Sequence, residues 1–309
     1  MGNILVTGGA GYIGQFAARE LASRGYNPII FDRKDASGEL NDPASIARAL
    51  ERNKIGAVMH FAASIEVGES MADPQKYYIN NVAGTLNLLK AMRDAGVMKL
   101  VFSSSAATFG LPQYTPMDEA HPQNPINTYG YTKLIMERMC ADFRRAYGLS
   151  YIAFRYFNAS GAAADGSMGE AHDPETHIIP LILKTIKGER EKFTIFGRDY
   201  DTPDGTCVRD YIHVEDLAAA HRLALEHLDE FSGGLNLSTG RGHSNLEILR
   251  KCEETTGKKC PFEWGERRPG DPDILVSDNK KAMEVLGWKP SRGIDDIIKS
   301  AWKWEKSKK

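Results

Sequence analysis

The stretch "NILVTGGAGYIG", residues 3–14, decides the fold. A short apolar segment at 3–7 leads into glycines 8, 11 and 14, and a segment with helical periodicity follows at 12–25. In a strand–turn–helix unit, Gly8 permits the tight turn, Gly11 lets backbone approach a pyrophosphate, and Gly14 lets the helix pack on the strand. The N–H groups at the start of the helix then favour phosphate. The simpler alternative is a turn with a helix-packing glycine and no ligand.

Strand and helix signals alternate outward from this unit. Apolar segments predict strands at 3–7, 28–32, 56–62, 99–105 and 150–157, and periodicity predicts helices at 12–25, 42–53, 74–96 and 128–148. This order predicts an α/β fold, a doubly wound parallel (Rossmann) sheet. The second half is less regular, and its long loops at 158–177 and 197–210 are expected to build a binding site.

Composition narrows the class of protein. The chain has 309 residues, 42% of them hydrophobic, which suffices for one large or two modest domains. The net charge is −2 with acids and bases interspersed, so no nucleic-acid partner is expected. The start moves directly into a strand, and no apolar run has membrane-spanning length, so no membrane association is expected. Four cysteines, none in a CxxC pair, indicate a reduced, cytoplasmic protein: Cys140, Cys207, Cys252 and Cys260.

Asp32 follows the second predicted strand, eighteen residues after Gly14. An acid there accepts hydrogen bonds from a ribose 2′-hydroxyl and repels a 2′-phosphate, which favours NAD over NADP. Arg33 and Lys34 point the other way, because a basic residue after this strand can hold a 2′-phosphate. The acid occupies the strand end, so the sequence predicts NAD.

The segment "TYGYTK", residues 128–133, opens the last long predicted helix. Residues four apart share a helix face, so Tyr129 can lie beside Lys133, whereas Tyr131 points elsewhere. A free tyrosine has a pKa of about 10, and nearby positive charge lowers it by stabilising the phenolate. Beside Lys133 and a cationic nicotinamide ring, Tyr129 is predicted to act as a general base near neutral pH. A solvated helix face is the alternative.

Together these motifs resemble the extended short-chain dehydrogenase/reductases. The resemblance rests on GxxGxxG, "HFAA" (60–63), "NNVAGT" (80–85), "SSSAATFG" (103–110), YxxxK (129–133) and "RYFN" (155–158). The segments "VRDYIHVEDLA" (208–218), "IFG" (195–197) and "RRPGD" (267–271) make the chain similar to the UDP-glucose 4-epimerases of that family, over nearly its whole length.

The resemblance implies inversion at C4 of a UDP-hexose, from UDP-galactose to UDP-glucose. Tyr129 removes the 4-hydroxyl proton while hydride leaves C4 for NAD⁺, and the 4-keto sugar turns before hydride returns. Ser105 hydrogen-bonds the 4-oxygen, and Lys133 also binds the nicotinamide ribose. Net redox change is zero, so NAD is expected to stay bound.

The resemblance also implies two domains and their ligands. A NAD-binding Rossmann domain is expected at 1–157 plus 210–240, and a UDP-sugar-binding domain at 158–209 plus 241–309. The implied cofactor-binding residues are Gly8, Gly11, Tyr12, Ile13, Gly14, Asp32, Glu39, Leu40, Phe61, Ala62, Ala63, Asn80, Ser103, Tyr129, Lys133 and Tyr156. The implied substrate-binding residues are Ser105, Tyr129, Phe157, Asn158, His177, Ile195, Phe196, Arg209, Tyr211, Arg268 and Asp271.

Arg209 and Arg268 are the expected diphosphate ligands, because guanidinium forks suit phosphate. Taken singly, each arginine could instead form a surface ion pair. His172 and His177 flank Asp173 and Glu175, which could suggest a metal site. A polar loop is the simpler interpretation, and no metal is expected.

Other reaction classes stay open. A dehydratase of the family carries Thr-Asp-Glu where this chain has Ser105-Ala106-Ala107, so the acids for eliminating water are missing. A net oxidoreductase on nucleotide sugars and a non-catalytic NAD(H) sensor are further alternatives, although a sensor needs none of the three catalytic side chains. Leu275 matches a position that gates N-acetyl groups, and its intermediate size leaves N-acetylated UDP-sugars and uronates open.

The chain departs from the family after Asp32, where "FDRKDASGELNDPASI" (31–46) leads almost directly into the next helix. Family members insert a helix and an edge strand there, so the second strand is expected to form the sheet edge. Glu39 and Leu40 align with a pair that holds adenine, and we expect NAD to be held less tightly. Ile65 and Glu66 stand where the family often has lysine. The family usually forms homodimers through helices equivalent to 74–96 and 128–148, so a homodimer is expected; a monomer that buries both helices fully is the alternative.

Overall fold

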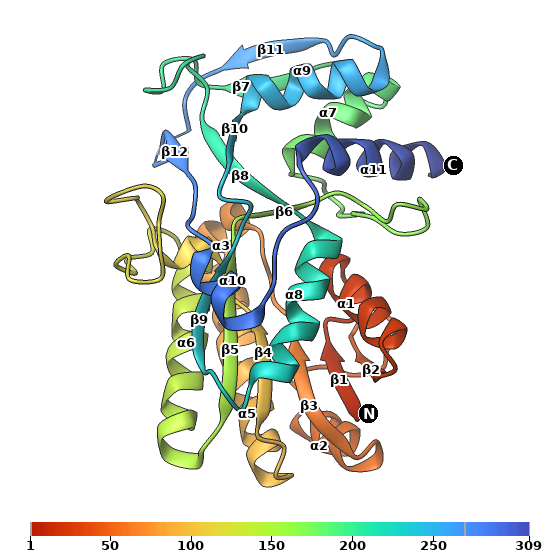
Figure 1. Cartoon of the computed structure of the whole chain (residues 1–309), viewed down its shortest axis with the longest axis vertical. Coiled ribbons are helices and arrows are strands. Elements are labelled where there is room, and N and C mark those ends of the chain that lie inside the picture. The colour runs from red at the N-terminus through yellow and green to blue at the C-terminus, as the bar shows by residue number, and fades with distance from the viewer. Residues whose placement is uncertain (1, 269, 309) are drawn as a thin grey trace.

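A six-stranded parallel sheet forms the centre of the molecule (Figure 1). The computed structural model describes residues 2–268 and 270–308. The strand order is β2-β1-β3-β4-β5-β9, and every neighbouring pair is parallel. The strands are β1 (Asn3–Thr7), β2 (Asn27–Phe31), β3 (Ile55–His60), β4 (Lys99–Ser103), β5 (Ser150–Tyr156) and β9 (Gly233–Leu237). The predicted doubly wound parallel sheet is confirmed.

Helices cover both faces of this sheet because each strand buries apolar side chains on both sides. One core contains α1 (Tyr12–Ser23) and α8 (Val214–His227), through side chains such as Leu21 and Leu217. The other contains α2 (Pro43–Arg52), α5 (Gly84–Asp94) and α6 (Thr128–Tyr147), through side chains such as Leu88 and Met136.

The helix predicted at 74–96 is interrupted. The chain forms α4 (Pro74–Tyr77), a π-helical segment at Tyr78–Ala83, and then α5. Such π turns are rare and concentrate at functional sites. The wider turn brings Asn81 inward, where its side chain accepts from Ser64 N at 2.8 Å and donates to Thr132 Oγ1 at 3.0 Å. Hydrophobic periodicity does not distinguish this wider turn from an ordinary one.

β2 forms an edge of the sheet, as the short segment after Asp32 predicts. Ser37 N and Gly38 N donate to Asp32 O at 3.1 and 3.2 Å, folding the chain back beneath the strand. A Cβ atom on Gly38 would lie 2.0 Å from the Phe31 ring, so only glycine fits there. The chain then enters α2, whose first turn Asp42 caps by accepting from Ala44 N.

The second part of the molecule lies at the top of Figure 1. Strands β6 (Asn158–Ser160), β8 (Val208–His213), β10 (Gly242–Ser244) and β12 (Ile274–Leu275) form one small sheet, and β7 (Phe193–Phe196) pairs with β11 (Phe262–Gly265). Helices α7 (Ile178–Lys187), α9 (Asn245–Thr256) and α11 (Ile294–Ser307) share a separate apolar core with them. The shorter helices are α3 (Val67–Ala72), α10 (Lys280–Leu286) and the 3-10 turn η2 (Ala106–Thr108).

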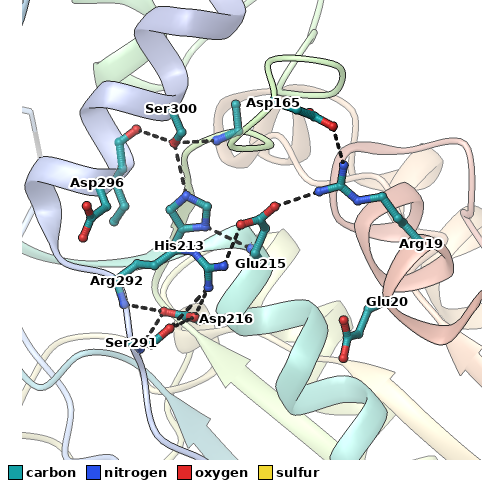
Figure 2. Close-up of polar contacts among 12 residues, drawn as sticks. Arg19, Glu20, Asp165, His213, Glu215, Asp216, Ser291, Arg292, Asp296 and Ser300 are labelled. Atoms are coloured by element: carbon teal, nitrogen blue, oxygen red, sulfur yellow. Dashed lines mark hydrogen bonds and ion pairs between the residues drawn. The ribbon is translucent and has the colours of Figure 1, made fainter. Parts of the chain in front are cut away.

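A polar network joins these layers where α1, α8 and the segment before α11 meet (Figure 2). Arg292 contacts Glu215 at 2.8 Å and Asp216 at 2.6 Å, and Arg19 reaches Glu215 at 2.7 Å from α1. His213 accepts from Glu215 N at 3.1 Å and shares a hydrogen bond with Ser300 at 3.1 Å. These contacts fix α8, which packs on the large sheet, to α11, which belongs to the second part of the molecule.

Candidate active site

A cavity of about 1030 Å³ opens at the carboxyl ends of the parallel strands. Ligands of open α/β sheets bind in this crevice because the loops after the strands converge there. Its walls include the glycine loop after β1, Asp32 after β2, Phe61 after β3 and Ser105 after β4. Arg209 and Arg268 close it from the second part of the molecule.

The glycine loop is shaped for a close ligand. Gly8 has φ +72°, and a Cβ atom there would lie 2.6 Å from Ala62 N. A Cβ atom on Gly14 would lie 2.2 Å from Gly8 O, so α1 can approach the turn only with glycine at that position. Gly11 is the N-cap residue of α1 and provides no side-chain cap, so the first N–H groups of the helix are left for a pyrophosphate in the cavity. These residues fit a dinucleotide.

The Asp32 carboxylate is held in place at the end of β2. Its Oδ2 accepts from Ala10 N at 3.0 Å and its Oδ1 from Lys34 N at 2.9 Å. A fixed carboxylate on the cavity wall suits a ribose diol and opposes a 2′-phosphate. Arg33 and Lys34 also line the cavity.

The wall after β3 is set by the π-helical segment. The Asn81 side chain accepts from Ser64 N at 2.8 Å and donates to Ser64 O at 3.0 Å. The Asn80 side chain donates to Ser64 Oγ at 3.1 Å. Buried backbone groups need such partners, so these amides fix the loop at 61–66. Ile65 and Glu66 then face the cavity.

Tyr129 and Ser105 meet on the cavity wall, and Lys133 lies beneath them. Asn127 caps α6 by accepting from Gly130 N at 2.8 Å, which places Tyr129 in the first turn. Lys133 Nζ lies 5.9 Å from the Tyr129 ring centroid and donates to Ser103 O at 2.7 Å. Tyr131 is 45% exposed, so the predicted separation of the two tyrosines is confirmed.

Burial governs the charges of these groups. It lowers the pKa of Lys133 to about 7, against the opposing effect of the Glu137 carboxylate. It also raises the pKa of Tyr129; contact with the Ser105 hydroxyl lowers that pKa, and the Glu66 carboxylate raises it further. The protein alone therefore favours a neutral phenol, and a phenolate requires an additional positive charge in the cavity.

The far end of the cavity carries the predicted diphosphate ligands. The Arg209 guanidinium donates to Val208 O at 2.7 Å and to the Asp271 carboxylate. Asp271 also accepts from Tyr200 at 3.0 Å. Arg268 stacks over the Phe196 ring at 4.1 Å. Two guanidinium groups on one wall suit a diphosphate.

Most residues predicted for the site come together. The predicted cofactor residues line the cavity, except Lys133, which is buried beneath it. The predicted substrate residues on the wall are Ser105, Tyr129, Phe157, Asn158, His177, Arg209, Arg268 and Asp271.

Three predicted substrate residues lie elsewhere. Ile195 and Tyr211 belong to the apolar core of the second part, and Phe196 lies off the wall beside Arg268. On β7, Ile195 and Phe196 alternate, so Ile195 faces the core. The expectation that Ile195 and Tyr211 contact substrate through their side chains finds no support in this placement.

Asn127 and Glu170 are among the wall residues that sequence reasoning did not identify. Asn127 positions Tyr129, and its signal was available, since asparagine before a helix is a favoured N-cap. Glu170 lies beside His172 and His177, and no local pattern predicts its convergence with them.

Glu170 and His177 carry strongly perturbed pKa values. Burial alone would raise the pKa of Glu170, but hydrogen bonds from His172 and His177 lower it. Burial would lower the pKa of His177, and the carboxylates of Glu170 and Glu175 raise it instead. His177 lies on the cavity wall, as predicted.

Among the described helices, none combines the length and the apolar character needed to cross a lipid bilayer.

Comparison with known proteins gives consistent matches over the whole chain. Residues 4–238 match the model of the NAD dependent epimerase/dehydratase family. The UDP-glucose 4-epimerase of Lactobacillus helveticus is 51% identical, with 98% of this chain and 97% of that protein covered. A Brucella ovis UDP-glucose 4-epimerase solved with NAD has 48% identity and a TM-score of 0.95, with 98% of each chain covered. The Stenotrophomonas maltophila enzyme solved with NAD and formylated UDP-arabinopyranose has 40% identity and a TM-score of 0.96, with 99% of this chain and 98% of that chain covered.

Proposed function

Because this chain belongs to the NAD-dependent epimerase/dehydratase family, we propose that it catalyses NAD-dependent inversion at C4 of a UDP-hexose, interconverting UDP-galactose and UDP-glucose. The observation that carries the proposal is the position of Ser105 and Tyr129 on a cavity wall between a dinucleotide loop and two arginines. The cavity has the dinucleotide loop at one end and the two arginines at the other, so NAD and a UDP-sugar can bind in it together.

The cofactor is NAD. The glycine loop, α1 and Asp32 would hold it, and when bound it supplies the acceptor and donor of hydride. Tyr129 removes the proton of the sugar 4-hydroxyl and later returns it. Ser105 hydrogen-bonds the 4-oxygen. Lys133, with a pKa of about 7, can hold positive charge beside the Tyr129 ring at neutral pH.

The UDP portion of the substrate would bind to residues of the second part of the molecule. We assign the diphosphate to Arg209 and Arg268 and the uridine ribose to Asp271. Asp271 pairs with Arg209, and this contact holds the arginine on the wall. Such preorganisation reduces the entropy lost on binding.

The turn after Ser105 argues against dehydration. Ala106 and Ala107 line the cavity where a dehydratase needs an acid to eliminate water. The chain keeps Ser105, Tyr129 and Lys133, which a cofactor sensor does not require.

One assay tests the proposal. Purified protein is incubated with UDP-galactose and no added NADH, and products are followed by chromatography and by absorbance of NADH. We expect UDP-glucose without net NADH release. Accumulation of NADH would indicate an oxidoreductase. A lasting 4-keto-6-deoxy product would indicate a dehydratase, and an unchanged mixture would indicate a cofactor sensor.

We also propose a cytoplasmic homodimer. Large apolar side chains are exposed on the two long helical segments expected at its interface: Tyr78, Ile79, Leu86, Tyr131 and Tyr147. The four cysteines are free and buried, which suits a reducing compartment.

A further inference from the structure

Four potential metal ligands converge on the loop between β6 and α7. Glu170, His172, Glu175 and His177, here called the 170–177 cluster, each offer one ligand atom, and these atoms all lie within 4.8 Å of one another. Glu170 contacts His177 at 2.8 Å and His172 at 3.0 Å, and Glu175 contacts His177 at 2.9 Å. The cluster closes a loop of eight residues on itself.

Glu175 supplies a second, independent observation. Its side chain is only 3% exposed, and its Oε2 is buried without a hydrogen-bond partner among the described residues. Buried carboxylate oxygens are costly when unpaired, because they lose their hydration. The contacts within the cluster use Oε1 and leave this oxygen uncompensated.

We propose that the 170–177 cluster binds a divalent transition-metal ion, with Zn²⁺ the best fit. Two imidazole nitrogens and two carboxylate oxygens form a mixed ligand set that zinc accepts in tetrahedral sites. The charge balances once the ion displaces the proton shared by His177 and the two glutamates, because the carboxylates then carry −2 and the ion +2. C4 inversion itself uses no metal, so this site is additional to the proposed reaction.

The position of the cluster indicates what the ion does. Tyr12, from the first turn of α1, packs edge-on against His172 with ring centroids 6.3 Å apart. The Tyr12 hydroxyl donates to Gly161 O at 2.6 Å, at the start of the same loop. An ion in the cluster would therefore fasten this loop beneath the dinucleotide loop and fix one wall of the cavity. Its expected effect is on stability, through binding to the folded chain only.

The test uses the full chain and zinc alone. Apoprotein prepared with a chelator is titrated with ZnCl₂ by calorimetry, and dialysed samples are analysed for metal by mass spectrometry. We expect one zinc per chain and a rise in melting temperature on adding zinc. X-ray data at the zinc edge should place the ion about 2.0–2.2 Å from nitrogen and oxygen ligands of the cluster.

Two variants and one control locate the ion. His172→Ala and Glu175→Gln should each weaken zinc binding by at least about 10–100-fold or abolish the thermal shift, since the loss of a mere outer-shell partner already has that effect in metal sites. His227→Ala removes a histidine that pairs with Glu230 at 2.9 Å on the distant end of α8, and it should bind zinc normally. If His172→Ala fails to fold, Glu175→Gln and the zinc-edge data decide.

The proposal is overturned if excess zinc leaves the protein without bound metal. It is also overturned if the variants and the control bind zinc equally, which would indicate an adventitious ion only. Neither result bears on the proposed epimerase activity, because the readouts are metal content, melting temperature and ion position.

Discussion

At the residue scale, Tyr129 depends on its surroundings for its charge. Its phenol lies against Ser105, and burial together with the Glu66 carboxylate raises its pKa. The helix spacing predicted its partner Lys133, but spacing says nothing about burial. Sequence reasoning therefore identified the pair and the need for the cationic nicotinamide ring, but it could not weigh the opposing effect of burial.

Replacing Tyr129 tests its role directly. Tyr129→Phe removes the phenol oxygen that takes the sugar proton, so we expect kcat to fall about 10²–10⁴-fold. KM should change little, because the ring remains. Steady-state kinetics with UDP-galactose measures this, and Tyr131→Phe, on the exposed side of α6, is the matched control. Retention of normal turnover by Tyr129→Phe would remove the base from the proposed mechanism.

Lys133 makes stability depend on pH. Its folded pKa of about 7 is below the ordinary value of 10.5, so between these values the unfolded chain binds more protons than the folded chain. The free energy of unfolding therefore rises with pH across this window. Against Lys133→Met, the ligand-free protein should gain up to about 1.4 kcal/mol per pH unit between pH 7 and 10.

Urea unfolding at several pH values measures the free energy of unfolding of the wild-type protein and of Lys133→Met. Subtracting one from the other cancels the contributions of the other titrating groups. A difference that stays flat, or falls as pH rises, would show that Lys133 remains charged in the fold.

At the scale of elements, the strands and helices of the sheet follow their sequence signals closely. The boundaries of β1, β2, α2 and α6 lie within two residues of the predicted ones, because apolar runs, Asp42 and Gly148 mark them. The π-helical segment was not predictable, since a single wider turn leaves the apolar pattern unchanged. It matters for function, because Asn80 and Asn81 fix the wall after β3.

The short segment after Asp32 carries a prediction about cofactor binding. β2 forms the sheet edge, and Glu39 and Leu40 reach the cavity from a compact turn without a further strand beside them. With less cover over the adenine side, we expect NAD to be lost on extended dialysis. The Brucella ovis enzyme, solved with NAD, serves as the matched control. Stoichiometric NAD in the dialysed protein, measured by absorbance after denaturation, would contradict this.

At the scale of the whole molecule, the cavity is built by both parts of the chain. The glycine loop, Asp32 and Tyr129 were identified from local patterns on the parallel sheet. Ser105, Arg209 and Arg268 required the resemblance, because no local pattern marks them: Arg209 lies on the short strand β8, and Arg268 lies outside any helix or strand. Ile195 lies in the apolar core because neighbouring positions alternate on β7, and Tyr211 joins the same core from β8.

The exposed apolar side chains on the two long helical segments predict an assembly. Leu86 is 40% exposed and Tyr131 is 45% exposed, and burying such groups between two copies would stabilise a dimer. We expect the double variant Leu86→Asp, Tyr131→Asp to sediment as a 34.2 kDa monomer. Leu111→Asp, an exposed leucine outside these helices, should leave the wild-type mass unchanged. A monomeric wild-type protein would refute the dimer.

The central claim is that hydride leaves C4 and returns to the same carbon within one cavity. UDP-galactose deuterated at C4 is incubated with the holoenzyme in excess unlabelled NADH, and the UDP-glucose formed is analysed by mass spectrometry and NMR. The account predicts full retention of deuterium at C4 with inverted configuration. Loss of the label to NADH or to solvent would contradict it.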